Sequence, residues 1–257
     1  MVEQMPVLRA ENLGITFGGL RAVEGFNLEL YHRELVGLIG PNGAGKTTIF
    51  NLLTGVYRPT EGMFYLGGKA MLGKKPHEMV GEGIARTFQN IRLFKNLSVI
   101  DNVKAAFNQK MKYSVAEAIL RLPRYWKEEA EIDCRARDIL KVFHMEDLAN
   151  QMSVNLPYGR QRKLEIARAI ATGARILLLD EPAAGMNPTE TAELMEAITI
   201  IRDRFNVAIL LIEHDMSLVM SICERIVVVD YGQIIASGTP YEVANNPKVI
   251  GAYLGGE

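Results

Sequence analysis

The chain has 257 residues, enough for one large domain, and its 48% hydrophobic and 23% charged residues are those of an ordinary water-soluble globular protein. Lys and Arg number 29 and Asp and Glu number 30, so the net charge is −1. This balance argues against a protein whose main ligand is nucleic acid, because such proteins usually carry a basic excess.

The N-terminal stretch MVEQMPVLRAENLG has neither a basic start nor a continuous apolar segment, so we expect no secretory signal. The most apolar runs, VAILLI and ILLL, are too short to cross a bilayer, and any membrane role must come through a partner. The two cysteines, Cys134 and Cys223, are far apart and outside any CxxC pattern. We expect both to be reduced, buried thiols without a metal or disulfide role.

Short strands dominate the first part of the chain. Apolar runs separated by glycines predict strands at residues 7–17, 25–31, 34–40 and 62–69. The third run, ELVGLIG, is nearly continuous and ends in glycine, as expected of a strand buried on both faces. Between the third and fourth strands, residues 46–54 have a helical pattern.

The middle of the chain is helical, with little strand pattern over residues 98–151 and an interruption near Pro123. After it, strands and helices alternate, with strands at 175–180, 207–215 and 225–230 and helices at 191–205 and near 217–224. This alternation is typical of a parallel sheet and predicts an α/β fold. We interpret residues 1–257 as one domain with a helical subdomain, approximately 98–160, inserted in its core.

A phosphate-binding loop follows the strand at 34–40. The stretch GPNGAGKT fits G-x-x-x-x-G-K-[ST] and lies between an apolar strand and a helix, which is the context that this motif requires. Backbone N–H groups and the helix N-terminus would surround the phosphates, Lys46 would reach the β- and γ-phosphates, and Thr47 would hold Mg²⁺. The alternative is a glycine-rich turn without a ligand. The predicted nucleotide-binding residues of the loop are Gly40, Pro41, Asn42, Gly43, Ala44, Gly45, Lys46, Thr47 and Thr48.

Polar residues follow two later strands at the edge where parallel sheets place their ligand groups. Asp180 ends the strand RILLLD and would hold Mg²⁺, while Glu181 would polarise the attacking water. His214, just past the next strand, would hydrogen-bond the γ-phosphate and hold the water and Glu181 in place. Gln89, in ARTFQN, would offer its amide to Mg²⁺ and the water. The alternatives are two acids capping a strand and an ordinary loop glutamine.

The stretches GPNGAGKTT, TFQN, LPYGRQRKLEIARA, ILLLDEPAAGMNP and IEHD occur in this order, and with them the chain resembles an ATP-binding-cassette (ABC) ATPase over essentially its whole length. The resemblance implies a P-loop NTPase fold with a mostly parallel core sheet, an N-terminal antiparallel β subdomain and a helical insertion. It implies ATP and Mg²⁺ as cofactors. By the same resemblance, Phe17 looks like the aromatic that stacks on adenine, with Val23 nearby, and Asn187 stands where the family usually has Asp.

The resemblance also implies that two cassettes meet head to tail, so that a signature sequence of one caps the γ-phosphate bound by the other. The signature residues would be Leu156, Pro157, Tyr158, Gly159, Arg160 and Gln161. Pro157 and Tyr158 depart from the usual L-S-G-G-Q, which removes the serine hydroxyl. We therefore assign the capping to the N–H groups of Gly159 and Arg160 and to the helix dipole, with Tyr158 fixing the turn and the following basic side chains suiting the anion.

Within the family, FGGLRAVEGFNLEL, ARTFQNIRLF and the C-terminal ASGTPYEVANNPKVIGAYLGGE are similar to the LivG-type ATP-binding subunits of bacterial importers of branched-chain amino acids. This implies several partners: a second related ATPase subunit or a homodimer, two membrane permeases, and a periplasmic binding protein reached indirectly. It implies a peripheral position on the cytoplasmic face of the inner membrane. We predict that residues 90–103 form the groove that receives the permease's coupling helix; the alternative is ordinary amphipathic packing.

Three other functions stay open. One is the ATPase of another ABC system, for lipid or lipopolysaccharide export or another solute, since a cassette does not touch the cargo. A cytosolic ABC ATPase acting on nucleic acid is disfavoured by the charge balance. A GTPase-type switch would normally carry an Asn-Lys-x-Asp element, which is not found in this sequence.

Overall fold

The computed structural model describes residues 5–110 and 113–254. Three pieces of segments used above lie outside the described residues: the start of the N-terminal stretch, 1–4, two residues of the predicted helical insertion, 111–112, and the end of the C-terminal stretch, 255–257. Within the described residues, no helix combines the length and the apolar character needed to cross a membrane.

A six-stranded sheet forms the core, in the order β10-β9-β3-β8-β7-β6. Every neighbouring pair in it is parallel except β10 and β9, so the prediction of a mostly parallel core sheet is confirmed. Strands β3, β7 and β8 are buried at every position, because helices or a second sheet cover both faces. The strands are β3 Leu35–Ile39, β6 Ile84–Arg86, β7 Ile176–Asp180, β8 Ala208–Ile212, β9 Arg225–Asp230 and β10 Gln233–Gly238.

The N-terminal strands form a separate antiparallel sheet in the order β2-β1-β4-β5, as predicted. Its strands are β1 Leu8–Phe17, β2 Leu20–Leu30, β4 Glu61–Leu66 and β5 Lys69–Ala70. The single strand predicted over 62–69 is wrong, because the chain reverses within it. Gly67 and Gly68 have φ of 51° and 81°, which is the backbone of a tight hairpin turn between β4 and β5.

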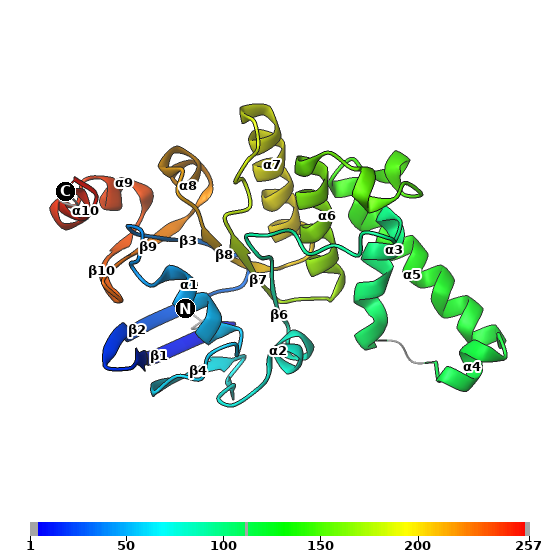
Figure 1. Cartoon of the computed structure of the whole chain (residues 1–257), viewed down its shortest axis with the longest axis horizontal. Coiled ribbons are helices and arrows are strands. Elements are labelled where there is room, and N and C mark those ends of the chain that lie inside the picture. The colour runs from blue at the N-terminus through cyan, green and yellow to red at the C-terminus, as the bar shows by residue number, and fades with distance from the viewer. Residues whose placement is uncertain (1–4, 111–112, 255–257) are drawn as a thin grey trace.

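Two hydrophobic cores lie on opposite faces of the six-stranded sheet, because successive strand residues point to opposite sides. Leu177 and Leu179 of β7 pack with α7 Pro188–Arg204 and α8 Met216–Ile222. Leu178 packs with α1 Lys46–Leu53 and the antiparallel sheet. Figure 1 shows α1 beside β1 and β2, on the other side of the core sheet from α7 and α8.

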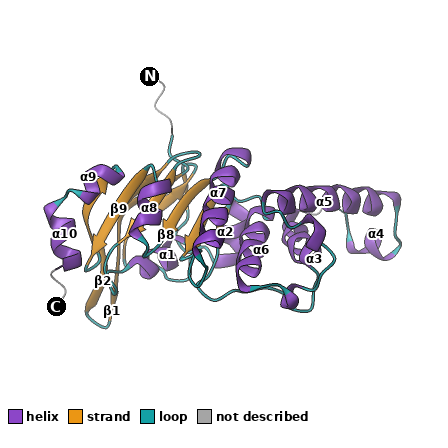
Figure 2. Cartoon of the chain, turned by 90° about the horizontal axis from the view of Figure 1, so that it is seen from above, coloured by secondary structure: helices purple, strands orange, loops and turns teal. Residues whose placement is uncertain are grey.

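A group of helices is inserted between β6 and β7 and extends to one side of the sheets (Figure 2). They are α3 Val99–Lys104, η1 Ala105–Lys110, α4 Val115–Ile119, α5 Pro123–Val142, η2 Glu146–Leu148, η3 Ser153–Asn155 and α6 Tyr158–Ala171. The expected interruption near Pro123 is the turn between α4 and α5, and the proline opens α5, where its missing N–H costs no helical hydrogen bond.

The sequence did not predict several short elements, namely α2 Pro76–Glu82, β6, β10, α9 Pro240–Ala244 and α10 Pro247–Leu254. The cysteine prediction was half wrong. Cys223 is buried, and burial raises the pKa of its thiol to about 12, but Cys134 is exposed. It lies on α5 between the buried positions Ile132 and Ala136, on the face that points to solvent.

Candidate functional site

The loop between β3 and α1 curves tightly beneath β9. Gly40 has φ of 154°, and a Cβ there would overlap the carbonyl oxygen of Val229. Gly45, at φ of 101°, approaches the carbonyl oxygen of Ala22, where a Cβ would lie only 2.8 Å away. Both positions therefore require glycine. The loop is fixed from the other side by Gly232, whose N–H donates to the Ala44 carbonyl at 2.9 Å.

Lys46 is the first residue of α1 and is almost fully buried, with 7% of its surface exposed. Its ammonium donates to the carbonyl oxygens of Gly40 at 2.6 Å and Pro41 at 2.9 Å, so it lies inside the loop. Burial lowers the pKa of Lys46, while the carboxylates of Glu181 and Asp180 act in the opposite direction. The ammonium is thus a cation with few protein partners, next to a curve of backbone N–H groups.

A cavity of about 210 Å³ opens over this loop. It is lined by the residues from Asn42 to Thr48, which include Thr47, and across from them by Glu181 and His214. The predicted phosphate loop and two of the three predicted catalytic residues therefore face one space. The other histidines, His32, His77 and His144, are exposed.

Asp180 ends β7 as a buried carboxylate paired with a buried guanidinium. Arg86 on β6 donates to Asp180 Oδ2 at 2.7 Å, and both side chains are 7% exposed. A second N–H of Arg86 donates to the Asn51 side chain on α1 at 2.6 Å. Arg86 was not among the predicted site residues, because β6 was not predicted and Asp180 lies 94 residues away in the chain.

Glu181 is at the centre of a side-chain cluster. Its Oε1 lies 2.7 Å from His214 Nε2, and its Oε2 accepts a hydrogen bond from the Gln89 amide at 3.1 Å. Glu181 has φ of 48°, a left-handed backbone that is strained for a residue with a side chain. Its N–H donates to the Ile212 carbonyl at 2.9 Å, which fixes this turn. The three residues predicted from separate motifs thus form one hydrogen-bonded group.

Phe17 and Val23, the two residues expected near the adenine, differ in their exposure to solvent. Phe17, at the end of β1, is 43% exposed and packs edge-on against Tyr57, with ring centroids 5.2 Å apart. Val23 is fully buried and lies behind the phosphate loop near Gly45. The exposed ring of Phe17 offers a stacking surface, whereas Val23 offers none.

The predicted signature residues surround the N-terminus of α6. Leu156 is buried, Pro157 is the N-cap, and the Gln161 amide donates back to the Leu156 carbonyl at 2.8 Å. Gly159 fits closely under Glu190, since a Cβ there would lie 2.7 Å from the Glu190 carboxylate. Contacts from the side chains of Gln161 and Glu190 therefore hold this turn.

Residues 23–184 match the family model of the ABC transporter, which covers more than half of the chain. The chain belongs to the ABC transporter family. It is an ATP-binding cassette and an ATPase. A second family model, branched-chain amino acid ATP-binding cassette transporter, matches residues 233–257.

Curated relatives and solved structures agree with the family. The cassette is 48% identical to the high-affinity branched-chain amino acid transport ATP-binding protein LivG of Escherichia coli K12, over 97% of this chain and 98% of that protein. It is 45% identical, with the same coverage, to BraF of Pseudomonas aeruginosa. The crystal structure of the ADP conformation of MJ1267, an ATP-binding cassette of an ABC transporter, has a TM-score of 0.84 and 30% identity, over 98% of this chain and 100% of that one.

The basic side chains after the signature turn have partners within the chain. Arg160 donates to the carbonyl oxygens of Phe143 and His144 at the end of α5, at 3.1 and 2.8 Å. Lys163 is buried and forms an ion pair with Glu193 on α7 at 2.6 Å. Cations are stabilised by unpaired carbonyls at a helix C-terminus, which explains the direction that Arg160 takes.

Arg162 is fully buried, and no role was predicted for it from the sequence. Its guanidinium donates to the carbonyl oxygens of Phe88 and Gln89, each at 2.6 Å, and pairs with Glu165 at 3.0 Å. It also donates to the Tyr158 hydroxyl at 3.2 Å. Arg162 therefore connects the signature turn of the cassette to the backbone of Gln89.

Two further residues fix the turn after β7. Glu213 directly follows β8 and is buried, and its carboxylate accepts hydrogen bonds from the N–H groups of Ala183 and His214 at 2.8 and 3.2 Å. Burial raises the pKa of Glu213. Asn187, the departure from the family pattern, caps α7 by accepting the N–H of Glu190 at 2.9 Å. Asp and Asn are equally good at this position, so the cap accounts for either residue.

Replacing Arg86 by Gln tests the buried ion pair. We expect the free energy of unfolding to fall by about 3–5 kcal/mol, because the change leaves the Asp180 charge buried without its partner. Urea denaturation followed by circular dichroism measures this fall. The matched control is Arg33→Gln, which breaks an exposed pair with Asp203 and should cost less than about 1 kcal/mol. Equal losses in the two variants would contradict the account.

Proposed function

We propose that this cassette is the ATP-hydrolysing subunit of an importer for branched-chain amino acids, leucine, isoleucine and valine. The observation that carries the hydrolytic part is the group of Glu181, Gln89 and His214 facing the phosphate loop across one cavity. The branched-chain match over residues 233–257 and the likeness to LivG and BraF support the substrate.

ATP would bind with its phosphates on the loop from Gly40 to Thr48 and its adenine on the ring of Phe17. Lys46 is already confined beside the loop, so its charge is available to the β- and γ-phosphates with little loss of side-chain entropy. Stacking on an aromatic ring is weakly selective between bases, so the preference for ATP rests on the family.

Mg²⁺ would be held by Thr47, Gln89 and Asp180. In the part of the chain that the structure describes, no three His, Cys, Asp or Glu side chains are arranged to hold a metal. This suits Mg²⁺, which usually takes one or two protein oxygens together with phosphates and water. The donor atoms suit Mg²⁺. Gln89 binds Glu181 through its amide nitrogen, and Arg86 binds Asp180 at Oδ2, so the amide oxygen of Gln89 and Oδ1 of Asp180 would be the metal ligands. When bound, Mg²⁺ would neutralise charge on the phosphates.

Glu181 would act as the general base for the attacking water, with His214 and Gln89 as the residues that orient it. The carboxylate is 17% exposed and accepts hydrogen bonds on separate oxygens, so its direction is fixed on both sides. A water beside Oε1 and Oε2 would lie toward the cavity above Lys46. His214, at 49% exposure, would also reach the γ-phosphate.

Two cassettes would form the working unit, as a heterodimer with a related ATPase subunit or as a homodimer. The N-terminus of α6 would cap the γ-phosphate bound by the partner, through the N–H groups of Gly159 and Arg160. The role of Tyr158 follows from its contacts: its hydroxyl binds Arg162, and its ring lies beside Gly185. It would therefore transmit the position of the turn to Gln89 through Arg162.

A permease would dock in a groove of about 250 Å³ between β6, η1 and α6. Phe94, from the segment predicted for this role, lines it together with Arg168, whose guanidinium lies 5.2 Å from the ring. Arg92 also lines it, and its N–H donates to Glu165, the partner of Arg162. A groove so close to Gln89 supports coupling of the permease to hydrolysis. In the proposed assembly the chain would lie on the cytoplasmic face of the inner membrane, and a periplasmic binding protein would deliver the amino acids to the permeases.

Replacing Glu181 by Gln tests the catalytic assignment. We expect kcat for ATP hydrolysis to fall by about 10²- to 10⁴-fold, the range for loss of a general base, while ATP binding persists and an ATP-bound dimer accumulates. Phosphate release and size-exclusion chromatography measure the two effects. Glu196→Gln removes an exposed carboxylate on α7 and serves as the control. Hydrolysis that survives in Glu181→Gln would rule out Glu181 as the base.

Uptake of radiolabelled leucine tests the substrate. The cassette would be expressed with the permeases and binding protein encoded beside it, in cells that lack their own branched-chain importers. We expect uptake that depends on Lys46 and is inhibited by unlabelled isoleucine and valine, because one import system would serve all three. Neighbouring genes for lipid or lipopolysaccharide export, with no leucine uptake, would favour the alternative.

A further inference from the structure

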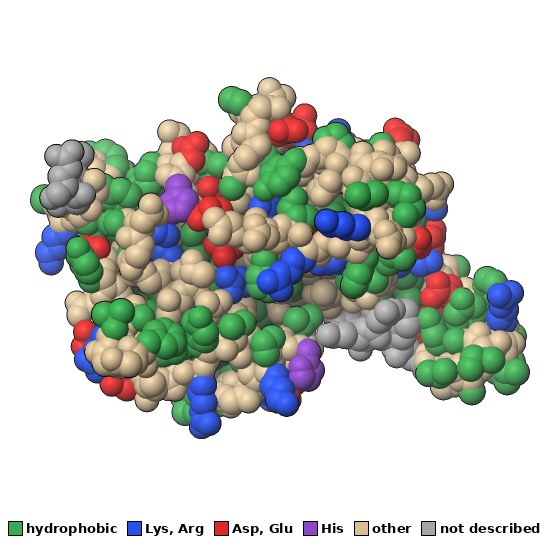
Figure 3. Space-filling view, viewed as in Figure 1, with side chains coloured by type: hydrophobic (Ala, Val, Ile, Leu, Met, Phe, Trp, Pro, Cys, Tyr) green, Lys and Arg blue, Asp and Glu red, His purple; other side chains and the backbone are tan. Residues whose placement is uncertain are grey.

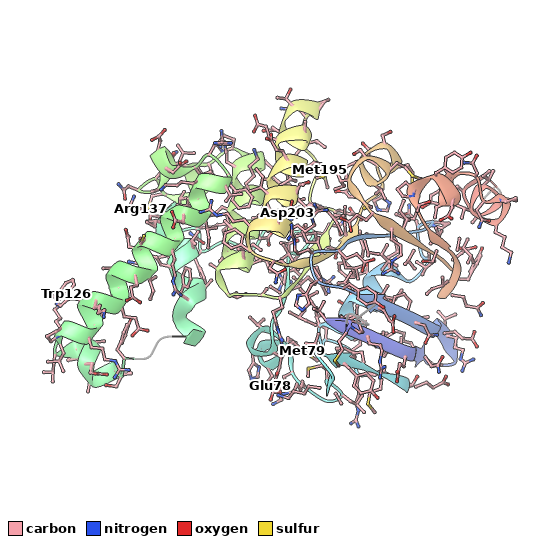
Figure 4. All side chains as sticks on the ribbon, turned by 180° about the vertical axis from the view of Figure 1, so that it is seen from behind. Glu78, Met79, Trp126, Arg137, Met195 and Asp203 are labelled. Atoms are coloured by element: carbon pink, nitrogen blue, oxygen red, sulfur yellow. The ribbon has the colours of Figure 1, made fainter. Side chains whose placement is uncertain are left out.

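The outer end of the helical insertion exposes an unusual amount of hydrophobic surface. We call residues 114–127, from the start of α4 to the first turn of α5, the tip. Val115, Ile119, Leu120 and Trp126 are 77%, 75%, 67% and 55% exposed. Figure 3 shows hydrophobic side chains gathered over this end of the molecule, and Figure 4 shows Trp126 at the far end of α5, directed away from the sheets.

Helical spacing brings these side chains together. Val115 and Ile119 are four residues apart on α4, and Leu122 and Trp126 are four residues apart where α5 begins. Residues at this spacing share one face of a helix. In a core helix such a face would pack against a neighbour, but here the side chains remain open to solvent. Contiguous exposed apolar surface of this kind marks an interaction site.

The tip is a folded hairpin. Ser114 and Glu117 form a capping box at the start of α4. Tyr125 packs edge-on against both Tyr113 and Trp126, with ring centroids 5.2 Å apart in each pair. The Tyr113–Tyr125 contact attaches the start of α4 to α5, so the exposed side chains are presented by a folded structure.

Basic residues lie on the exposed surface of the tip. Arg121, Arg124 and Lys127 are exposed basic residues among the hydrophobic ones. Glu117, Glu128 and Glu129 are half-buried, and Glu117 forms an ion pair with Arg124 at 3.6 Å. Glu117 accepts the Ser114 N–H at 2.6 Å, and Glu129 binds Lys104 at 3.1 Å and the Tyr113 hydroxyl at 3.0 Å. The outer surface therefore combines aliphatic side chains, a tryptophan and positive charge.

We propose that the tip binds the surface of an anionic lipid bilayer, with Trp126, Ile119 and Val115 entering the headgroup region and Arg121 and Lys127 contacting anionic headgroups. Tryptophan and aliphatic side chains flanked by Lys and Arg suit the membrane interface, where each residue type has a favourable place. The centre of a protein interface is also enriched in tryptophan and arginine, but it is depleted in lysine, and here Lys127 lies next to Trp126. A bilayer therefore fits this surface better than a protein partner does.

The direction of the tip agrees with this proposal. In Figure 1, α4 and α2 lie on the same side of the molecule, and Val80 of α2 and Ala105 of η1 line the groove proposed for the permease. A permease bound in that groove would bring the tip toward the membrane that holds the permease. This step rests on the proposed function, whereas the binding of lipid by the tip does not.

The test uses the purified full-length chain and vesicles of phosphatidylcholine with about 30% phosphatidylglycerol, compared with vesicles of phosphatidylcholine alone. Trp126 is the only tryptophan of the chain, so its fluorescence reports on the tip directly. We expect its emission to shift to shorter wavelength and the chain to sediment with the anionic vesicles. Neutral vesicles should bind about tenfold less.

Three variants separate the contributions. Val115→Ser with Ile119→Ser should weaken binding to anionic vesicles about tenfold, with Trp126 kept as the reporter. Arg121→Gln with Lys127→Gln should abolish the preference for anionic lipid. Tyr241→Ser, which changes a side chain with 80% exposure on α9, should have no effect. ATP hydrolysis by each variant shows that it is folded.

Three outcomes would overturn the proposal. The Trp126 emission and sedimentation could be unchanged by both kinds of vesicle. Binding could survive both pairs of tip substitutions, which would place the lipid site elsewhere. Trp126 could become buried as the protein concentration rises in the absence of vesicles, or when permease protein alone is added. Either result would make the tip a protein interface. Because the assay needs neither nucleotide nor amino acid, its failure would leave the proposed transport function standing.

Discussion

The carboxyl edge of the core sheet confines charged groups where little water reaches them, and most of the site follows from their need for partners. Lys46, Asp180 and Glu213 are each 5–7% exposed, and the side chain of Arg86 is equally buried. A buried charge without a partner is costly. Asp180 is therefore paired with Arg86, Glu213 is bound by two backbone N–H groups, and the ammonium of Lys46 is held by carbonyl oxygens of its own loop.

From that edge, a continuous set of contacts leads to the helical insertion. Glu181 is bound to Gln89, and the backbone of Gln89 accepts from Arg162 on α6. Arg162 reaches Tyr158 at the signature turn, and its partner Glu165 binds the N–H of Arg92 beside the groove proposed for the permease. A displacement at the turn or at the groove would thus move the residue that orients Glu181. Coupling between sites requires contiguous contacts of this kind together with an element that has two arrangements.

The features that the sequence predicted are those that depend on contiguous residues. The phosphate loop, the buried strands β3, β7 and β8 and the helical insertion follow from local motifs and apolar periodicity. Prediction failed where a partner lies far away in the chain. The partners of Arg160 and Lys163 within the chain, which are Phe143, His144 and Glu193, were not predicted. Arg86 and Asp180 are 94 residues apart, and the pair is recognisable only once β6 lies beside β7. The short elements were missed because three to eight residues carry too little periodic pattern.

The most direct test of the account is the affinity for ATP with Mg²⁺, measured by isothermal titration calorimetry on the wild type and on Lys46→Ala. The control is Lys163→Met, which removes a lysine that is buried to a similar degree but paired with Glu193 outside the phosphate loop. We predict that Lys46→Ala weakens binding by about tenfold or more, as expected for loss of a charge-assisted contact with phosphate, while Lys163→Met leaves the affinity nearly unchanged. Equal affinity of Lys46→Ala and the wild type would contradict the assignment of the buried ammonium to the phosphates.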